Sequence, residues 1–439
     1  MATLLIKNAS ILAPRGLIDG SMLIEGSRIS KIGAISAKAD TTIDAKGKIA
    51  IPGLVNAHTH VSMTILRGYG EDLPLERWLK EKIWPIEAKQ NLADVEASAN
   101  LSFCEMIRSG TTAFADTSLF DPSVIMNAAK KAGMRGIVAQ SYLDFGNEKK
   151  TKEAIDRLAS YATKIKNSGT KKPKSKKSVD SSGGDLVSLS IAVHAPYSCS
   201  KELLIKAKEA ADKTGLKLQI HASETRTEIF DCLKERGKYP IEYLEDIGFL
   251  GKDCILAHAG WLTKREISII GKRKASVASC PISNLKLATG GISQITELDS
   301  AGANVALGTD SAASNNCLDM FQTMKLASLL QKHHYWKADV LPVKQAFDFA
   351  TKNGASALGF DSGTIEPGKL ADIILLERLP NMVPQHDLLS NLVFSAGAQN
   401  VTDSIINGVV AMRERRILTL DEARVMERAE KSAQDIKTR

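Results

Sequence analysis

Apolar and polar positions divide the chain into three regions. Residues 1–50 alternate over short runs such as TLLIKNASIL and SMLIEGSRISKIG, separated by Gly, Asp and Asn turns, which predicts short, half-buried strands. The same pattern returns in GTIEPGKLADIILLE and VTDSIINGVVAM, after residue 363. We predict one small β-sandwich built from both chain ends, 1–50 and 363–439. Helical spacing in the terminal TLDEARVMERAEKSAQDIKTR, after a Thr cap candidate, predicts an amphipathic helix there.

The middle region, residues 51–362, alternates apolar runs with helical segments such as SKELLIKAKEAADKTG. Repeated strand–helix units with eight strands predict an α/β fold, a closed (β/α)₈ TIM-type barrel. No G-x-G-x-x-G or P-loop motif supports a nucleotide-binding open sheet instead. The eight predicted strands are 51–58, 111–116, 135–140, 186–194, 216–221, 254–258, 275–279 and 304–310.

Composition adds a cellular setting. Hydrophobic residues make up 44% and charged residues 25% of the 439 positions, which is ordinary for a globular protein. No apolar run reaches the roughly 20 residues that span a bilayer, and the N-terminus lacks a signal-peptide pattern. Six cysteines are scattered without a C-x-x-C pair, which fits reduced thiols. These features predict a cytoplasmic protein with no membrane partner.

The net charge of +8 is largely local. Five lysines lie in KKPKSKK, residues 171–177, so 8 − 5 leaves +3 for the remainder. No aromatic residue is interleaved with these lysines, so we expect a solvated loop and no nucleic-acid partner. The surrounding polar, Gly/Ser-rich segment, 166–185, predicts a disordered surface insertion.

Polar residues gather where the predicted barrel strands end. Besides the strand 111–116, which ends in Asp116, five of the eight strands end in His or Asp, and five of the eight histidines of the chain are used there. Carboxyl ends of barrel strands meet at one mouth, so these side chains should converge. The residues are His58 (with His60), His194, His221, His258 and Asp310.

Each of these residues has a simpler interpretation when taken singly. An H-x-H pattern like that in NAHTH arises by chance in many chains, although residues two apart in a strand face the same side. A His at a strand end is often a hydrogen-bonded structural residue, and Asp310 is a plausible helix cap. Their joint occurrence at strand ends favours a metal site. His333, His334 and His386 lack that context, and we expect them to be structural or surface residues.

Seven motifs extend this interpretation to a family. They are, in order, PGLVNAHTH, MTILRGYGEDLPLERWLKEKIWPIEAK, VHAPYSCS, HASET, CILAHAG, SNLKLATGG and LGTDSAASNN. In this order they resemble the amidohydrolase superfamily, within it the deaminases of 5-methylthioadenosine and S-adenosylhomocysteine. The resemblance covers nearly the whole chain. It implies hydrolytic deamination of an adenosine-type nucleoside, giving the inosine analogue and ammonia through a metal-activated water.

The same resemblance implies roles for the strand-end residues. One divalent metal ion per chain, usually zinc, would be held by His58, His60, His221 and Asp310. Binuclear relatives carry a carboxylated lysine at the end of strand four, where this chain has His194. A single ion is therefore expected. Family members are commonly homo-oligomers, so a dimer or tetramer is expected as well.

Further roles follow by motif. The resemblance makes Glu224 the acid/base, His258 the residue that orients the attacking water, and Asp310 a second proton acceptor. It makes Glu87 and His194 substrate contacts, with Glu224 and Asp310 also at the substrate. From position alone a solvated helix carboxylate is the favoured interpretation of Glu87, and the resemblance reverses that preference.

The choice of substrate stays open at this level. In the deaminase branch an arginine often ends strand three and meets the 5′-substituent, whereas the matching residue here is Gln140. A charged homocysteine tail therefore lacks a partner there, and 5′-deoxyadenosine, methylthioadenosine or adenosine is expected to serve as well. Guanine deamination and triazine dechlorination use similar motifs and remain alternatives. The intact residue set argues against a non-catalytic barrel.

Overall fold

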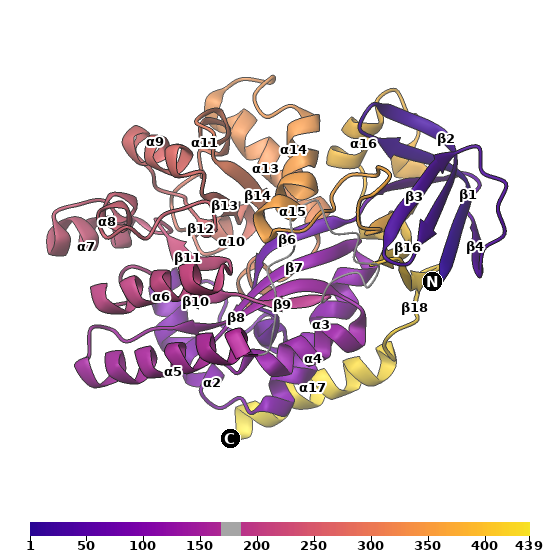
Figure 1. The fold of residues 1–439 in the computed structure, drawn as a ribbon. Coiled ribbons are helices and arrows are strands. Elements are labelled where there is room, and N and C mark those ends of the chain that lie inside the picture. The colour runs from indigo at the N-terminus through magenta and orange to yellow at the C-terminus, as the bar shows by residue number, and fades with distance from the viewer. Residues whose placement is uncertain (168–185) are drawn as a thin grey trace.

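The computed structural model describes residues 1–167 and 186–439, and its centre is a barrel of parallel strands (Figure 1). Hydrogen bonds join them in the order β6, β7, β8, β10, β11, β12, β13 and β14, with β9 paired to β8. The strands are β6 (Leu54–Thr59), β7 (Thr111–Ser118), β8 (Arg135–Tyr142), β9 (Val187–Leu189), β10 (Ile191–Val193), β11 (Leu218–Ala222), β12 (Cys254–His258), β13 (Ser276–Ser279) and β14 (Asn304–Leu307).

The first and last strands close the barrel through their side chains and their carboxyl ends. The amide of Asn56 exchanges hydrogen bonds with Thr309, at 2.7 Å and 3.0 Å. The N–H of Asp310 donates to the carbonyl of His58 at 2.9 Å. A side chain at Gly308 would lie 2.9 Å from the backbone of His58, so this approach requires glycine. Closure therefore brings His58 and Asp310 together.

Helices cover the outside of the barrel, because each presents an apolar stripe to the strands. In α6 (Lys201–Thr214) the cap Ser200 accepts from the N–H of Leu203, and Gly215 ends the helix in the left-handed region. The other helices of the barrel are α3 (Leu92–Arg108), α4 (Pro122–Ala132), α5 (Glu148–Asn167), α7 (Arg226–Arg236), α8 (Pro240–Asp246), α9 (Lys264–Arg273), α10 (Pro281–Lys286), α11 (Ile295–Ser300), α12 (Ala312–Asn315), α13 (Met320–Tyr335), α14 (Val343–Ala350) and α15 (Lys352–Leu358). Of these, α10 and α12 lie at the mouth, where Ser283 and Ser314 donate to Asp310.

A chain segment after β6 leads from the barrel mouth to α3. It contains η1 (Val61–Leu66), α1 (Leu75–Arg77), the π-helical turn η2 (Trp78–Ile83) and α2 (Trp84–Glu87). Its apolar residues, including Leu75, Trp78 and Ile83, are buried in one cluster with η1. We call residues 75–87 the cover segment.

Both ends of the chain build a second, mixed sheet beside the barrel (Figure 1). Its order is β18-β17-β16-β15-β5-β1-β2-β3, with β4 on β1, and residues from both ends share one apolar core. Its strands are β1 (Thr3–Ala13), β2 (Gly16–Glu25), β3 (Arg28–Gly33), β4 (Thr41–Asp44), β5 (Lys48–Pro52), β15 (Ile373–Glu377), β16 (Val401–Ile406), β17 (Val409–Arg413) and β18 (Arg416–Ile417). Here α16 (Leu388–Phe394) follows β15, and α17 (Glu422–Thr438) ends the chain against α3.

The predicted fold class is confirmed, with local differences. The fourth predicted strand is split at Ser190, whose N–H donates to the carbonyl of Val138 between β9 and β10. The cap of α17 is Asp421 and not Thr419, because the Thr419 hydroxyl donates to the carbonyl of Ala132. The domain boundaries at residues 50 and 363 stay a prediction. Of the predicted insertion, residues 168–185 lie outside the described residues.

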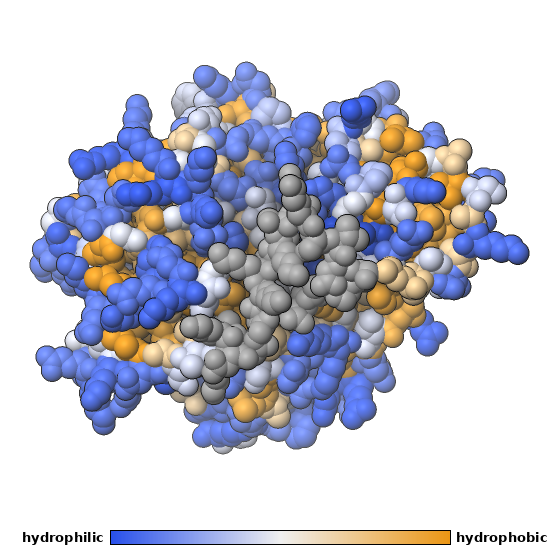
Figure 2. Space-filling view, viewed as in Figure 1, coloured by the Kyte–Doolittle hydropathy of each residue, from blue (hydrophilic) through white to orange (hydrophobic). Residues whose placement is uncertain are grey.

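The described surface is mostly hydrophilic, with apolar residues over β1 to β3 of the end sheet (Figure 2). None of the helices in the described ranges has the length and apolar character needed to cross a membrane. His333, His334 and His386 are exposed, as predicted.

Candidate active site

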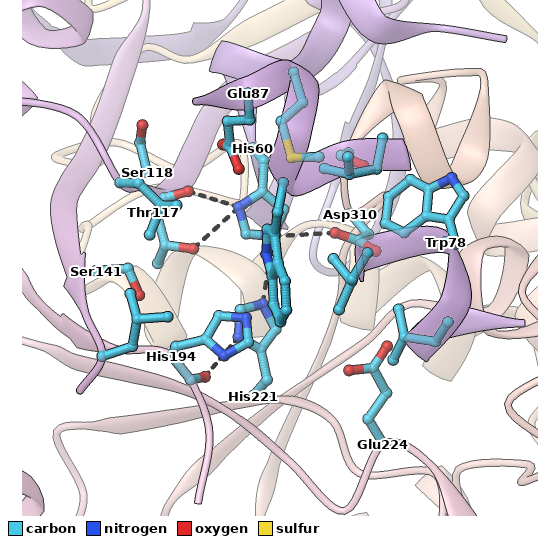
Figure 3. Close-up of a pocket in the computed structure, with 18 of the residues that line it drawn as sticks. His60, Trp78, Glu87, Thr117, Ser118, Ser141, His194, His221, Glu224 and Asp310 are labelled. Atoms are coloured by element: carbon cyan, nitrogen blue, oxygen red, sulfur yellow. Dashed lines mark hydrogen bonds and ion pairs between the residues drawn. The ribbon is translucent and has the colours of Figure 1, made fainter. Parts of the chain in front are cut away.

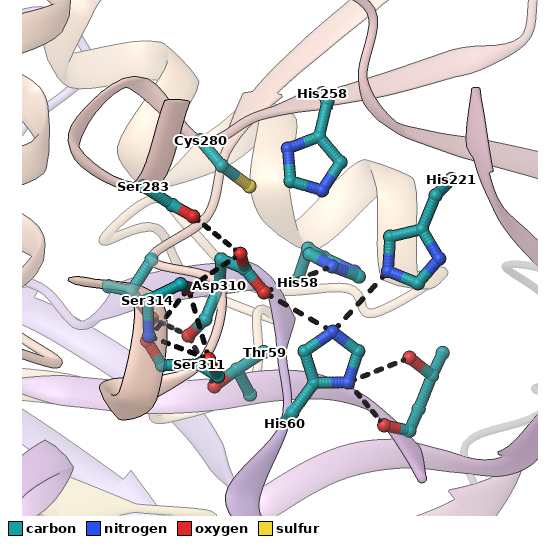
Figure 4. A network of polar contacts seen from close by, with 12 residues as sticks. His58, Thr59, His60, His221, His258, Cys280, Ser283, Asp310, Ser311 and Ser314 are labelled. Carbon is teal, nitrogen blue, oxygen red and sulfur yellow. Dashed lines mark hydrogen bonds and ion pairs between the residues drawn. The ribbon is translucent and has the colours of Figure 1, made fainter. Parts of the chain in front are cut away.

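Imidazoles from three strand ends meet one carboxylate at the barrel mouth (Figure 4). The ring centroids of His58 and His60 are 4.8 Å apart, and those of His58 and His221 are 4.9 Å apart. Asp310 Oδ1 lies 3.2 Å from His60 Nε2 and 3.7 Å from His58 Nε2. The structure thus brings together the four residues predicted to bind one metal.

Backbone carbonyls set which ring nitrogen faces the cluster. His60 Nδ1 lies 2.6 Å from the carbonyl oxygen of Thr117, and His221 Nδ1 lies 2.7 Å from that of His194. A carbonyl only accepts, so each Nδ1 donates and each Nε2 of a neutral ring carries a lone pair. These two Nε2 atoms are 3.3 Å apart. Two facing lone pairs are unfavourable unless a proton or a metal cation lies between the rings.

The remaining two residues of the cluster fit a cation as well. His58 Nε2 is buried and has no hydrogen-bond partner in the described part of the chain. Asp310 Oδ2 accepts from the hydroxyls of Ser283 at 2.6 Å and Ser314 at 2.8 Å, which leaves Oδ1 toward the imidazoles. Three imidazoles and a carboxylate are a donor set that suits Zn²⁺ and similar divalent ions. The residues present fit a metal.

The backbone at this rim is strained. Ser223, His258 and Asp310 have φ values of 53°, 72° and 61°, in the left-handed region. Each such residue costs on the order of 1–3 kcal/mol, and such strain gathers at functional sites. All three lie at the carboxyl ends of strands that carry predicted site residues. Of the three, His258 and Asp310 line the cavity at the mouth, and Ser223 immediately precedes Glu224, which lines it too.

Glu224 and His258 lie side by side next to the cluster. His258 Nδ1 donates to the amide oxygen of Asn284 at 2.8 Å, which turns Nε2 toward Glu224 Oε1, 3.7 Å away. Burial raises the pKa of Glu224, opposed by the nearby His258. A carboxyl group with a raised pKa beside an imidazole is suited to accept and return a proton near neutral pH.

The predicted substrate contacts line the same cavity (Figure 3). The side chain of His194 is held by Ser198, with Nδ1 2.7 Å from Oγ, and burial lowers its pKa to about 4. Glu87, at the end of α2, is buried yet makes no side-chain hydrogen bond with the described residues. Burial raises the pKa of Glu87 to about 7. An unpartnered carboxylate facing a cavity is available for a ligand.

The cavity encloses about 690 Å³ of empty space, which includes its open mouth. Apolar side chains of the cover segment, including Trp78, Leu79 and Trp84, line it together with these polar groups. No lysine or arginine lines it among the residues that the structure describes. A cavity of this size and lining suits a small, largely uncharged ring compound.

Several side chains at the site were missed from the sequence. Glu228 accepts hydrogen bonds from the N–H groups of Ser223 and Glu224, each at 2.8 Å. Gln140 does not line the cavity, because its amide donates to the carbonyl of Leu119. The neighbouring Ser141 lines it instead, with a buried hydroxyl that has no partner in the ranges described. Neighbouring residues of a strand point to opposite faces, so Ser141 faces the cavity and Gln140 does not.

The barrel and its cluster define a class of protein. A (β/α)₈ barrel with imidazoles and a carboxylate converging at the carboxyl ends of its strands is typical of hydrolases that use a divalent metal. The chain belongs to the amidohydrolase family, whose family model matches residues 49–411.

Two relatives at about 40% identity are named as deaminases. The chain is 41% identical over 438 residues to a 5′-deoxyadenosine deaminase of Methanothermobacter thermautotrophicus, covering 99% of each chain. It is 39% identical over 414 residues to 5-methylthioadenosine/S-adenosylhomocysteine deaminase 1 of Archaeoglobus fulgidus, covering 93% of each. The resemblance inferred from the motifs is confirmed.

Solved structures agree. An adenosine deaminase from Xanthomonas campestris with bound zinc superposes with a TM-score of 0.90 at 30% identity, covering 100% of this chain and 99% of that one. An atrazine chlorohydrolase from Arthrobacter aurescens reaches a TM-score of 0.87 at 22% identity, covering 98% and 100%. The second likeness shows the fold alone.

Proposed function

We propose that this protein hydrolyses the 6-amino group of adenosine-type nucleosides, releasing ammonia and the inosine analogue. One arrangement carries the proposal. The imidazole–carboxylate cluster, the proton-transfer pair Glu224 and His258, and the free carboxylate of Glu87 all surround one cavity. A base at the cluster and a ribose at Glu87 would fill that space together. The deaminase relatives and the adenosine deaminase structure support the same reaction.

We infer one zinc ion per chain, held by His58, His60, His221 and Asp310. A divalent ion in such a site lowers the pKa of a water from ~15.7 to about 7. The second cluster of nearby donors, His58, His258 and Asp310, shares two of these residues. The presence of His194, in place of a bridging lysine, supports a single ion.

The chain's own residues move the protons. When water adds to C6 of the base, Glu224 takes its proton and delivers it to N1. His258 faces Glu224 and steadies the attacking oxygen. Asp310 accepts the second proton, which leaves with the amino group as ammonia. The products balance: nucleoside and water give the 6-oxo nucleoside and ammonia.

A cavity without lysine or arginine among its described lining residues favours small, uncharged 5′ groups. Apolar residues of the cover segment face the space beside Glu87, and no cation lines it among the described residues. This supports 5′-deoxyadenosine, methylthioadenosine and adenosine as substrates. Guanine and triazines lack a ribose, so Glu87 would have no partner in those reactions.

Ammonia release tests the proposal. The panel contains 5′-deoxyadenosine, methylthioadenosine, S-adenosylhomocysteine, adenosine, free adenine, guanine and a chlorotriazine. Nucleosides should turn over and free bases should not. Faster turnover of guanine or the triazine than of every nucleoside would replace this function by the alternative one. The predictions of a homo-oligomer, dimer or tetramer, and of a cytoplasmic location remain. Sedimentation of the purified protein would measure the oligomeric state.

A further inference from the structure

Asp116 is a buried carboxylate beside the cluster that has no role in the proposed function. It lies in β7, the strand next to β6, in register with Thr59, and it is fully buried. Its Oδ1 accepts from the N–H of Val61 at 2.7 Å, and its Oδ2 has no hydrogen-bond partner in the described part of the chain. Burying a carboxylate with so few partners costs free energy. The bond to Val61 is therefore the contact to explain.

The N–H of Val61 lies where the chain turns from β6 into η1. His60 is the residue at that turn, with φ −129° and ψ 86°, and its own side chain makes no capping hydrogen bond. The first N–H groups of a helix have no partner within the helix, so Asp116 supplies the acceptor from the neighbouring strand. The carbonyl of Val61 accepts in turn from the hydroxyls of Ser98 and Ser102, at 2.8 Å and 3.1 Å. The backbone directly after His60 is thus held on both sides.

The residue after Asp116 holds the imidazole ring of His60 itself. His60 Nδ1 lies 2.6 Å from the carbonyl oxygen of Thr117 and 3.3 Å from its hydroxyl oxygen (Figure 3). Two consecutive residues of β7 therefore hold His60, one through the peptide that follows it and one through its ring. Together they fix both the position of the backbone and the direction of Nε2, which faces the cluster.

The backbone of Asp116 is also tied to β11, the strand of His221. The side-chain amide of Gln219 donates to the carbonyl of Asp116 at 3.3 Å and to the hydroxyl of Ser190 at 2.8 Å. Because β8 and β10 lie between β7 and β11 in the sheet, this side chain crosses the barrel interior. Gln219 precedes His221 by two residues, so both point to the same side of β11. Asp116 thus links the strands of His60 and His221, whose Nε2 atoms are 3.3 Å apart.

We infer that Asp116 is a positioning residue for His60 as a metal ligand. Its carboxylate holds the N–H of Val61, and through that peptide it keeps His60 Nε2 directed at the cluster. The inference rests on the proposed function, because it requires a divalent ion at the cluster. It assigns no proton transfer to Asp116. Without this bond, His60 keeps the contact of its ring with Thr117 but loses the fixed backbone that carries the ring.

The affinity of the purified protein for a metal ion tests this role directly. Asp116→Ala removes the acceptor, so the dissociation constant of Zn²⁺, measured by competition with a chromophoric chelator, should rise by ~10–100-fold, as for other groups that orient a metal ligand. The visible absorption spectrum of the Co²⁺-loaded variant should change as well, since it reports the geometry of the ligands. Asp144→Ala is the matched control, because Asp144 is equally buried, accepts from the hydroxyls of Thr151 and Ser200, and does not line the cavity. It should leave both readouts unchanged.

Asp116→Asn separates the bond to Val61 from the charge of the carboxylate. Its amide oxygen can still accept from that N–H, so this variant should recover most of the lost affinity and the wild-type Co²⁺ spectrum. If Asp116→Ala does not fold, Asp116→Ser takes its place, because the serine hydroxyl is one bond shorter and does not reach Val61.

Wild-type affinity in the Ala or Ser variant, or an affinity in Asp116→Asn as low as in that variant, would overturn the positioning role. If wild-type protein binds no divalent ion or deaminates no nucleoside, the proposed function itself has failed. If wild type does both and the Ala or Ser variant binds the ion equally well, only the role of Asp116 is wrong.

Discussion

The carboxylate of Glu228 holds the backbone of Glu224. Its two oxygens accept hydrogen bonds from the N–H groups of Ser223 and Glu224, both at 2.8 Å, and the side chain is 3% exposed. Ser223 adopts a left-handed backbone conformation, which costs free energy, so this turn depends on the two hydrogen bonds. Burial raises the pKa of Glu228 to about 8, and the two N–H groups oppose that shift. Glu228 is therefore a positioning residue for the proposed acid/base.

Removing this clamp should reduce turnover more than binding. Glu228→Ala leaves two buried N–H groups unpaired, at roughly 1–3 kcal/mol each. We expect kcat to fall more than about tenfold with KM changed little, since the lost contact orients Glu224. Glu228→Gln should recover part of the rate, because its amide oxygen accepts from one N–H. Steady-state kinetics and metal content measure both variants. Equal kcat in Ala and wild type would contradict the clamp.

The metal prediction concerns stoichiometry. Elemental analysis of purified protein should find about one divalent ion per chain, because three imidazoles and one carboxylate form a single four-donor site. His221→Ala removes one of two Nε2 atoms that lie 3.3 Å apart, so the ion should be lost with activity. His334→Ala, at an exposed position, is the control. Two ions per chain, or full activity after thorough chelation, would contradict the mononuclear site.

Glu224 should behave differently from the metal ligands. Glu224→Gln keeps the shape of the side chain but cannot accept and return a proton, and such groups contribute typically ~10²–10⁴ in rate. We expect retained metal and turnover lowered by that range, measured as ammonia release under saturating nucleoside. Glu202→Gln, at an exposed position on α6, provides the matched control. A near-normal kcat in Glu224→Gln would mean that another group moves the proton.

Periodicity predicted much of the fold because each barrel strand is a local apolar run. The approach of His58 to His60 follows from the period of two, and the convergence of strand ends follows from parallel order. Closure also depends on Gly308 and on the Asn56–Thr309 hydrogen bonds, which join positions 253 residues apart. Such contacts leave no periodic signal.

The orienting groups of the site were not predictable in the same way. Backbone carbonyls such as that of Thr117 belong to every residue type, so the sequence does not mark them. Glu228 lies four residues after Glu224, and nothing in the sequence distinguishes it from other acidic residues. Its role is visible only in its hydrogen bonds to the backbone of Ser223 and Glu224. The motif comparison pointed to Gln140 at the cavity, whereas the structure places Ser141 there. In a strand, an error of one residue moves the side chain to the opposite face.

Glu87 separates a nucleoside deaminase from relatives that act on rings alone. A carboxylate only accepts hydrogen bonds, and its two oxygens can hold neighbouring 2′- and 3′-hydroxyls at once. Hydrogen bonds to a charged group contribute roughly 1.5–3 kcal/mol, so Glu87→Ala should lower kcat/KM for 5′-deoxyadenosine or methylthioadenosine by more than about tenfold. The metal should remain, because Glu87 lies outside the ligand cluster. Wild type should also prefer these nucleosides to adenine and to their 2′,3′-dideoxy analogues.

The pH dependence of binding supplies the sharper test of this residue. Burial raises the pKa of Glu87 to about 7, so the carboxylate form grows as pH rises through that value. The ionised form is the one that accepts two hydroxyls, and therefore KM for 5′-deoxyadenosine should fall as pH rises from 6 to 8. Glu87→Gln cannot titrate and should lose this dependence, while groups that titrate elsewhere still affect kcat. The same dependence in wild type and Glu87→Gln, or an equal response with a 2′,3′-dideoxy substrate, would show that Glu87 does not bind the ribose.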